Sequence, residues 1–217
     1  MQRCQACGRS LAEDNGLLCP VCFDMLRPVS SAVCPVCLLP LPVTRVCGFC
    51  LERPRPWLRG AFYGGYAGHL RELILAYKFS GQLGHGMLLR YFLRQACLLH
   101  ELSRPDLIFP VPMTADSLRR RGYNQAWELC RGLAQTIGGR ESFSFLRKIR
   151  FTPAQAVLSR EERRGNLAGA FEARPLSGER ILLVDDVLTT GATLEECAWA
   201  CLRAGAGSVE ILVLARA

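Results

Sequence analysis

A run of nine residues near the C-terminus, 185–193, brings together side chains that could bind a phosphorylated sugar. It reads Asp-Asp-Val-Leu-Thr-Thr-Gly-Ala-Thr and follows four apolar residues. Two carboxylates that leave a buried strand are costly unless they bind a ligand, and sugar hydroxyls are suitable partners. The glycine lets the backbone turn tightly, so that N–H groups can face an anion at the start of the next helix. The run lacks the Gly-x-x-x-x-Gly-Lys pattern, so it is not a Walker A nucleotide-binding loop.

A second group of chemically active residues lies at the other end of the chain. Eight of the 12 cysteines fall within the first 50 residues, as the pairs Cys4 and Cys7, Cys19 and Cys22, Cys34 and Cys37, and Cys47 and Cys50. A Cys-x-x-Cys turn points two thiolates at one point, and Zn²⁺ takes four sulfurs in a tetrahedron. Four pairs therefore predict two zinc sites. Four protein ligands leave no open position, so both sites are predicted to be structural.

The way in which the cysteine pairs combine stays open at this point. Joining neighbours is simplest, but the spacing also permits interleaved sites. A disulfide-linked segment is an alternative in an oxidising compartment, whereas a thioredoxin-like redox site is disfavoured because no βαβ pattern surrounds any pair. The remaining cysteines are predicted to be buried small hydrophobic residues: Cys97, Cys130, Cys197 and Cys201.

The run 185–193 needs a strand before it and a helix after it. The apolar pattern predicts a buried strand, a helix and a second buried strand over residues 181–184, 193–204 and 209–214. Thr193 and Glu196 match a capping box, and Gly205 matches the residue that follows a helix end. Together these elements predict a βαβ unit with parallel strands, whose carboxyl ends are where such sheets bind ligands.

The rest of the chain predicts further elements around this unit. Helices are predicted over residues 69–78, 83–99 and 124–137, and strands over 106–111 and 143–149. Residues 61–68 are expected to form a hairpin or a short strand pair with a turn at Gly64 and Gly65. The two prolines in 52–57 indicate a linker, and the polar, Arg-rich residues 151–171 indicate a long loop, which is usually functional or mobile.

Length and composition limit the class of protein. The chain has 217 residues, of which 50% are hydrophobic and 21% charged, so it fits a full domain plus a small one and is not a disordered chain. We place the small domain at residues 1–56 and the larger one at 57–217. No apolar run reaches the roughly 18 residues that span a bilayer, and the N-terminus does not resemble a secretory signal. We therefore expect a cytoplasmic protein without membrane insertion.

The net charge of +8 is concentrated in one part of the sequence. Residues 119–150 carry +6, whereas residues 1–60, 61–118 and 151–217 carry +3, +1 and −2. A basic stretch suits a phosphate-rich ligand or a nucleic acid, although a solvated helix face in an arginine-rich chain accounts for it as well. Tyr123 and Trp127 are the obvious aromatic candidates for base stacking in this stretch, and both are expected to lie in the core.

Residues 182–193 resemble the signature with which type I phosphoribosyltransferases bind phosphoribosyl pyrophosphate (PRPP). Apolar strand positions, two acids, two apolar residues and Thr-Thr-Gly-x-Thr match without a departure. The resemblance implies an α/β fold with a parallel sheet flanked by helices, like that of type I phosphoribosyltransferases. Here that fold would follow a small double zinc ribbon with two four-cysteine sites.

The chain as a whole resembles the ComF/GntX family, whose members are associated with DNA uptake during natural competence. The match covers the four cysteine pairs, a Pro-Trp segment, the triplet 77–79 and residues 110–112, 119–125, 152–155, 160–166 and 170–171. The resemblance implies two structural Zn²⁺ sites and binding of PRPP together with Mg²⁺. It also implies single-stranded DNA and a competence helicase or another DNA-uptake protein as partners.

Carried over to this sequence, the resemblance assigns roles to individual residues. Asp185 and Asp186 would hold the ribose 2′ and 3′ hydroxyls, as the candidate catalytic residues. The 5′-phosphate would be held by Thr189, Thr190, Gly191, Ala192 and Thr193, and the adjoining Val187 and Leu188 would also belong to the PRPP-binding residues. Pro112, Arg119 and Arg121 fall in the place of the pyrophosphate loop, and Lys78 at another PRPP-binding position. A mobile loop over the site would include Thr152, Gln155, Arg160, Arg163, Arg164 and Asn166.

Three functions stay open at this point. The first is a phosphoribosyltransferase that moves the phosphoribosyl group of PRPP to an unidentified acceptor and releases pyrophosphate. The second is an accessory protein that handles single-stranded DNA without catalysis. The third is a regulatory protein that senses PRPP without turnover.

Overall fold

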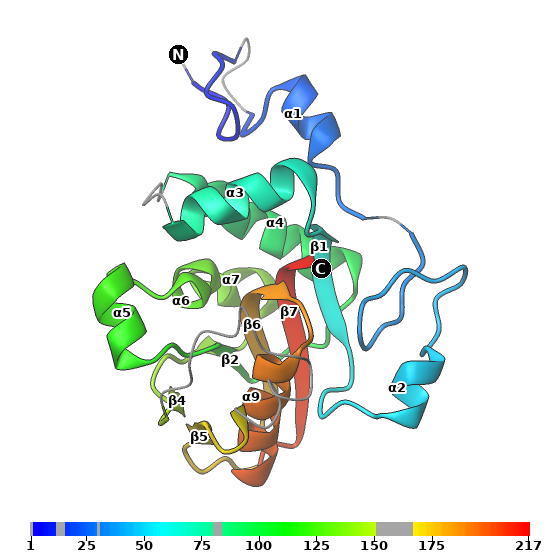
Figure 1. Ribbon diagram of the computed structural model, residues 1–217, viewed down its shortest axis with the longest axis vertical. Helices are drawn as coiled ribbons and strands as arrows, with labels where there is room; N and C mark the ends of the chain where they lie inside the picture. Colours follow the sequence, from blue (N-terminus) through cyan, green and yellow to red (C-terminus); the bar gives the residue numbers. More distant parts are fainter. Residues whose placement is uncertain (1, 12–15, 30, 80–83, 151–166) are drawn as a thin grey trace.

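A computed structural model describes residues 2–11, 16–29, 31–79, 84–150 and 167–217 and shows an α/β fold (Figure 1). Five strands form one sheet in the order β1-β7-β6-β2-β3, and every neighbouring pair is parallel. Their bounds are β1 Gly60–Gly65, β2 Leu107–Pro110, β3 Arg140–Glu141, β6 Arg180–Leu188 and β7 Ser208–Arg216. The predicted βαβ unit is confirmed, because β6 and β7 pair in parallel on either side of the connecting helix α9 (Ala192–Arg203).

Both faces of the sheet are covered, which explains why its strands read as continuous apolar runs. On one face, side chains such as Leu182 and Val184 pack against α3 (Gly68–Phe79) and α4 (His85–Leu99). On the other face, side chains such as Leu183 pack against α9. This second face also holds an antiparallel pair, β4 (Leu146–Lys148) with β5 (Phe171–Ala173).

The cysteine-rich segment forms two similar units, which we call ribbon 1 (residues 2–26) and ribbon 2 (residues 33–52). Each begins with an isolated bridge, Arg3 to Ser10 and Val33 to Pro40, and ends in a short helix, α1 (Pro20–Met25) or α2 (Gly48–Glu52). In Figure 1 ribbon 1 lies over α3, whereas α2 of ribbon 2 lies beyond the edge strand β1.

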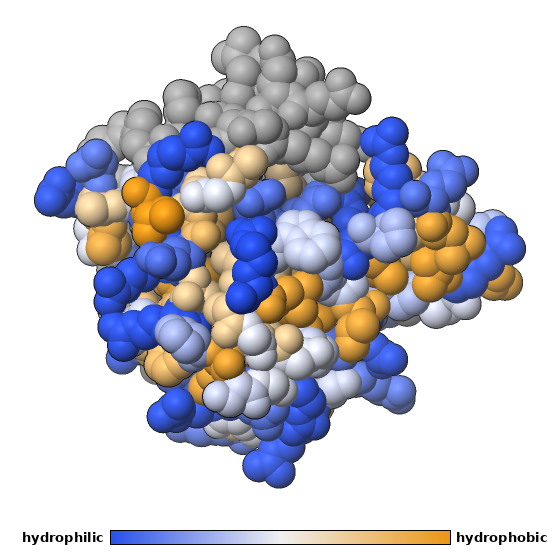
Figure 2. Space-filling view, turned by 90° about the horizontal axis from the view of Figure 1, so that it is seen from below, coloured by the Kyte–Doolittle hydropathy of each residue, from blue (hydrophilic) through white to orange (hydrophobic). Residues whose placement is uncertain are grey.

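The two ribbons pack on different clusters of the core. Leu26 of ribbon 1 belongs to the cluster that contains α3 and α4. Val33 and Leu38 of ribbon 2 belong to the cluster that contains α9. The side of the molecule on which ribbon 2 lies carries hydrophobic side chains among hydrophilic ones (right of Figure 2). Exposed hydrophobic residues of this unit include Val43, Val46 and Leu51.

Several predicted elements differ from those observed. Residues 60–65 form the single edge strand β1 rather than a hairpin, because the strand pairs with β7 from the far end of the chain. The predicted helix 124–137 is two helices, α6 (Gln125–Cys130) and α7 (Ala134–Ile137), which are separated at Gly132 with a φ of +76°. A further helix, α5 (Ala115–Arg121), lies in the place where the resemblance implied the pyrophosphate loop.

Two local predictions around the acid pair are also wrong. Strand β6 continues to Leu188, so Asp185 and Asp186 lie on the strand and not in the loop after it. The N-cap of α9 is Gly191 without a side-chain hydrogen bond, so no capping box forms. Glu196 accepts a hydrogen bond from the Gly169 backbone N–H instead, at 3.1 Å.

Within the described ranges, no helix combines the length and the apolar character that crossing a membrane requires.

Candidate functional site

The acid pair lies at the carboxyl end of β6, beside the end of β2. The two strand ends are joined by a hydrogen bond from the Val111 N–H to the Val184 carbonyl, at 2.8 Å. Lys78 reaches this edge from the end of α3, and its Nζ lies 2.7 Å from Asp186 Oδ2. Both side chains are largely shielded from solvent. The fold therefore brings together three predicted site residues, although Lys78 lies far from the acid pair in sequence.

Two cavities meet at this edge of the sheet. The first is lined by Asp185 and residues 187–194, and therefore by the whole predicted phosphate loop. The second, of about 200 Å³, is lined by Lys78, Val111, Pro112, Met113, Asn124, Gln125, Ala126, Asp185, Asp186 and Thr193. Asp185 and Thr193 belong to both cavities. Asp185 therefore lies at the boundary between a small loop cradle and a larger opening, and Asp186 faces the larger opening, an arrangement that suits a ligand with phosphate groups at both ends of a sugar.

The loop cradle is held open by its backbone conformation. Gly191 has a φ of +83°, in the region that glycine adopts without strain. The Thr190 Oγ1 accepts a hydrogen bond from the Ala192 N–H at 3.4 Å, which connects the turn to the first residue of α9. The N-terminus of α9 faces the loop, and free N–H groups at such an end attract anions.

The environment of the two carboxylates differs. Burial raises the pKa of Asp185 to about 7, the neighbouring charge of Asp186 raises it as well, and Lys78 acts in the opposite direction. The Asp186 backbone N–H also donates to Asp185 Oδ1 at 2.9 Å. Without a ligand, Asp185 therefore titrates near neutral pH, whereas Asp186 has a cationic partner.

The raised pKa predicts a pH-dependent stability. The folded protein holds the Asp185 proton more tightly than the unfolded chain, so this group lowers the free energy of unfolding as pH rises towards 7. Between about pH 5.5 and 7 this group should lower the free energy of unfolding by up to about 2 kcal/mol, and we expect Asp185→Asn to remove that change. Urea unfolding at both pH values measures it. Equal slopes in the two proteins would contradict the assignment.

The remaining predicted contacts are less closely tied to the cavities. Pro112 lines the larger one, whereas Arg119 lies on the exposed side of α5 and pairs with Asp116 at 2.9 Å. Arg121 belongs to the same helix. All named residues of the predicted mobile loop fall within 151–166 and so lie outside the described residues: Thr152, Gln155, Arg160, Arg163, Arg164 and Asn166.

The eight N-terminal cysteines gather into two clusters that join neighbouring pairs. One contains Cys4, Cys7, Cys19 and Cys22, the other Cys34, Cys37, Cys47 and Cys50, and in each all sulfurs lie within 4.8 Å of one another. Tetrahedral zinc with Zn–S bonds of about 2.3 Å places its sulfurs about 3.8 Å apart. The Sγ atoms of Cys7 and Cys19 are 3.8 Å apart and those of Cys37 and Cys47 are 3.6 Å apart. The clusters therefore fit two closed structural zinc sites.

Backbone N–H groups prepare one thiol of each cluster for metal binding. Burial raises the pKa of Cys4, but backbone N–H donors from Cys19, Cys7 and Ala6 outweigh it and lower the pKa to about 6. In the same way the pKa of Cys34 falls to about 7. The thiolate is the form that binds zinc.

The four other cysteines are buried, as predicted. They lie on α4, α6 and α9, apart from both clusters. These residues therefore take part in core packing.

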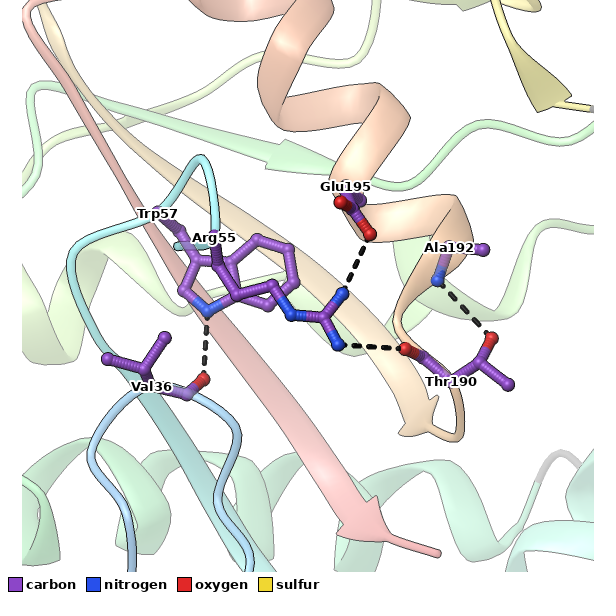
Figure 3. A network of polar contacts seen from close by, with 6 residues as sticks. All are labelled: Val36, Arg55, Trp57, Thr190, Ala192 and Glu195. Carbon is purple, nitrogen blue, oxygen red and sulfur yellow. Dashed lines mark hydrogen bonds and ion pairs between the residues drawn. The ribbon is translucent and has the colours of Figure 1, made fainter. Parts of the chain in front are cut away.

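Two arginines beside the loop were missed by sequence reasoning. Arg55, in the segment expected to be a linker, pairs with Glu195 of α9 at 2.7 Å (Figure 3). Arg216, at the end of β7, donates to the Leu188 and Thr189 carbonyls at 3.0 and 2.9 Å. The sequence around each arginine gives no signal for these contacts, because the partners lie far away along the chain.

Comparisons with known proteins cover both ends of the chain. A family model described as the double zinc ribbon domain matches residues 2–51. "DNA utilization protein YhgH" of Salmonella typhimurium is 35% identical over 98% of this chain and 96% of that protein. "Competence protein F" of Haemophilus influenzae is 32% identical over 99% of this chain and 97% of that protein.

Among solved structures, the "allosteric regulatory enzyme of purine biosynthesis" aligns with 58% of this chain and 25% of its own. The sequence identity is 20% and the TM-score is 0.38.

Proposed function

Since the chain belongs to the family of DNA utilization protein YhgH and competence protein F, we propose that it binds PRPP with Mg²⁺ and transfers the phosphoribosyl group to an acceptor. The observation that carries this proposal is the order of groups along the site. The loop cradle comes first, then the boundary at Asp185, which lines both cavities, and then the larger opening, which Asp186, Lys78 and Pro112 also line. This order corresponds to the 5′-phosphate, the ribose diol and the pyrophosphate of PRPP.

Each group has a role that its chemistry supports. The backbone N–H groups and hydroxyls of residues 189–193 bind the 5′-phosphate, and the carboxylates of Asp185 and Asp186 accept hydrogen bonds from the ribose hydroxyls. Lys78 places a positive charge on the pyrophosphate side. Carboxylate oxygens also suit a hard cation, so Asp185 and Asp186 could share the Mg²⁺ that arrives with PRPP, which would neutralise charge on the leaving group.

The reaction breaks the bond between ribose C1 and a pyrophosphate oxygen, and a nucleophilic atom of the acceptor forms the new bond to C1. The electron pair of the broken bond leaves with pyrophosphate. The protein stabilises that developing charge, positions the reactants and excludes water. A proton on the nucleophilic atom passes to the departing pyrophosphate or to water, so the scheme requires no residue of the site as a separate general base.

The proposal is tested by thermal unfolding with three ligands, each in the presence of Mg²⁺. PRPP at 100 times its Kd should raise the melting temperature by about 5 °C or more, since binding at that excess adds about 2.7 kcal/mol. Ribose 5-phosphate and pyrophosphate, which each fill part of the site, should raise it less. A melting temperature that does not move with millimolar PRPP would rule the proposal out. Pyrophosphate release with a pool of acceptors then separates an enzyme from a PRPP sensor.

A second candidate function is binding of single-stranded DNA, and one observation favours it. Trp127 is 41% exposed, so the expectation that it lies in the core is wrong. Its ring stacks on Phe143 at 4.6 Å between centroids and 14° between planes, which presents a fixed aromatic surface. Trp127 and Phe143 lie within the stretch that carries +6. An exposed aromatic ring among arginines is the usual combination for stacking bases and binding phosphates.

Trp127→Ala tests this candidate against a matched variant. Trp199 on α9 is exposed to almost the same extent, 43%, but lies outside the basic stretch. We expect Trp127→Ala to weaken oligo(dT) binding about tenfold, since stacking is worth about 1–3 kcal/mol per base, and Trp199→Ala to have little effect. Fluorescence anisotropy at two salt concentrations measures both. Equal affinities of the two variants would argue against a DNA surface at Trp127.

A further inference from the structure

The segment that joins ribbon 2 to the sheet is locked against the phosphate loop. The Arg55 side chain is only 7% exposed, and its Nη1 donates to Glu195 Oε2 at 2.7 Å while its Nη2 donates to the Thr190 carbonyl at 3.4 Å. Trp57, beside it in Figure 3, donates from Nε1 to the Val36 carbonyl at 2.9 Å. The segment predicted to be a linker therefore connects ribbon 2 with the loop and the first turn of α9.

A second arginine makes the same connection from the C-terminus. Arg216 donates from Nε to the carbonyl of the cluster cysteine Cys37 at 2.9 Å. Its Nη1 donates to the carbonyls of Leu188 and Thr189. Together with Arg55, it occupies the carbonyls of three consecutive residues, Leu188, Thr189 and Thr190.

Holding these carbonyls also orients the N–H groups of the loop. In a trans peptide unit the C=O of one residue and the N–H of the next point in opposite directions, and the described residues contain no cis peptide bond. The three carbonyls that the arginines hold therefore direct the N–H groups of Thr189, Thr190 and Gly191 away from Arg55 and Arg216. Those three residues line the loop cradle. The arginines thus act on the part of the loop that faces a phosphate.

The position of Arg55 depends in turn on the second zinc cluster. Its guanidinium carbon lies 5.7 Å from the ring centre of Phe49 and 5.4 Å from that of Trp57. Phe49 lies between the zinc ligands Cys47 and Cys50. Without metal, the turn that presents Phe49 has little else to hold it, because Cys50 is the only buried residue of α2.

A strained residue shows how firmly ribbon 2 is attached. Leu38 has a φ of +64°, where ribbon 1 has Gly8 at the equivalent place with a φ of +76°. Such a conformation costs a leucine roughly 1–2 kcal/mol. The Leu38 side chain is 0% exposed and belongs to the cluster that contains Trp57 and α9, so its burial offsets the strain.

We propose that Arg55 and Arg216 are positioning residues of the anion loop, and that through them metal in the second cysteine cluster sets the affinity of that loop for the 5′-phosphate. The inference rests on the proposed PRPP site. Ribbon 1 makes a different set of hydrogen bonds. Its Gln5 carbonyl bonds to His85 Nδ1, and its Leu26 carbonyl accepts from the Tyr63 hydroxyl. Metal in the first cluster therefore has no such route to the loop through the described contacts.

The experiment compares one ligand variant from each cluster. Cys47→Ser and Cys7→Ser change the less buried ligands of the second and first cluster. Metal analysis of each purified variant should show one zinc ion per chain fewer than in the wild type. We expect Cys47→Ser to weaken PRPP binding about tenfold and Cys7→Ser to weaken it less than about threefold, within the usual range of coupling between contacting groups. Amide hydrogen exchange over residues 188–194 should rise in Cys47→Ser and stay close to wild type in Cys7→Ser.

Variants of Arg55 test the route itself. Arg55→Met should weaken PRPP binding and raise amide exchange over residues 188–194 as much as Cys47→Ser does. Arg55→Lys should weaken binding less, because lysine keeps the positive charge but lacks the two-pronged guanidinium group. Arg27→Met, at an exposed arginine after α1, is the control for removing a surface cation. Adding Cys47→Ser to Arg55→Met should cause little further loss, because both changes interrupt the same route.

The exchange measurement keeps this inference separate from the proposed function. If the wild-type protein binds no PRPP, the proposed function fails, and faster exchange of the loop in Cys47→Ser still supports the coupling. Unchanged exchange over 188–194 in Cys47→Ser protein that has lost its second zinc would overturn the coupling. Faster exchange with unchanged PRPP affinity would overturn its link to the anion site.

Discussion

Asp186→Asn should weaken PRPP binding by about 30- to 100-fold, which makes it one of the two largest effects that the structure predicts. In the proposed PRPP site this carboxylate accepts hydrogen bonds from the ribose hydroxyls, and a hydrogen bond to a charged group is worth about 1.5–3 kcal/mol. The substitution also removes the partner of Lys78, whose Nζ lies 2.7 Å from Asp186. Equilibrium dialysis or calorimetry with PRPP and Mg²⁺ measures the loss.

A control separates loss of the site from a general loss of charge. Asp24→Asn removes a carboxylate from an exposed ion pair with Arg27, after which PRPP affinity should equal that of the wild type. Circular dichroism of both variants shows whether the fold is kept. An Asp186→Asn variant that folds and binds PRPP as tightly as the wild type would contradict the assigned role of the acid pair.

Removal of zinc should produce the other large effect, the unfolding of residues 2–51. Apart from their cysteines, the buried residues among those described in the two ribbons are Leu26, Val33 and Leu38, and α1 has no buried residue. Structural zinc contributes about 10–16 kcal/mol of apparent binding free energy in small zinc-binding peptides, far more than these short units gain from packing. We expect two zinc ions per chain in the native protein. After chelation, amide exchange should become fast throughout the ribbons.

Cysteine variants identify the sites at which the metal is lost. Cys97→Ala changes a buried cysteine of α4 and should keep two zinc ions per chain, whereas each variant of a cluster cysteine should keep one. Protection of residues 2–51 that survives complete removal of zinc would contradict the structural role. A protein that binds no zinc after refolding in its presence would do the same.

The sequence was most informative where chemistry restricts the choice of residue. Metal binding accounts best for thiols at Cys-x-x-Cys spacing in the first 50 residues, and the structure confirms two clusters formed from neighbouring pairs. The acid pair and the loop after it were also recognisable, because adjacent carboxylates at the end of an apolar strand suit ligand binding far better than packing. The buried strand before them, the helix after them and the parallel partner strand are all confirmed.

Sequence reasoning failed where distant contacts override a local pattern. Thr193 and Glu196 have capping-box spacing, but Glu196 binds the Gly169 backbone N–H, which comes from another part of the chain. The prolines around Arg55 suggested a linker. The ion pair of Arg55 with Glu195 could not be predicted, because the two residues are 140 positions apart in the sequence. Trp127 was assigned to the core from its hydrophobic ring, although its actual neighbour is the half-buried ring of Phe143.

The division of the chain at residues 56 and 57 stays a prediction. Residues on both sides of this point, Arg55 and Trp57, contact the same loop, and Gly191 lies so close that a Cβ there would be 3.4 Å from the Trp57 ring. The small N-terminal module and the sheet therefore share a packed boundary. Within this boundary, Arg216 contacts both the Cys37 carbonyl of the second cysteine cluster and the carbonyls of Leu188 and Thr189.

The central claim is that the acid pair and the loop after it form a PRPP site. Isothermal titration calorimetry of the zinc-loaded, full-length protein with PRPP and Mg²⁺ tests it most directly. We predict saturable binding of one PRPP per chain with a micromolar Kd, and weaker binding when Mg²⁺ is withheld. No detectable binding of millimolar PRPP to folded protein that carries both zinc ions would contradict the claim.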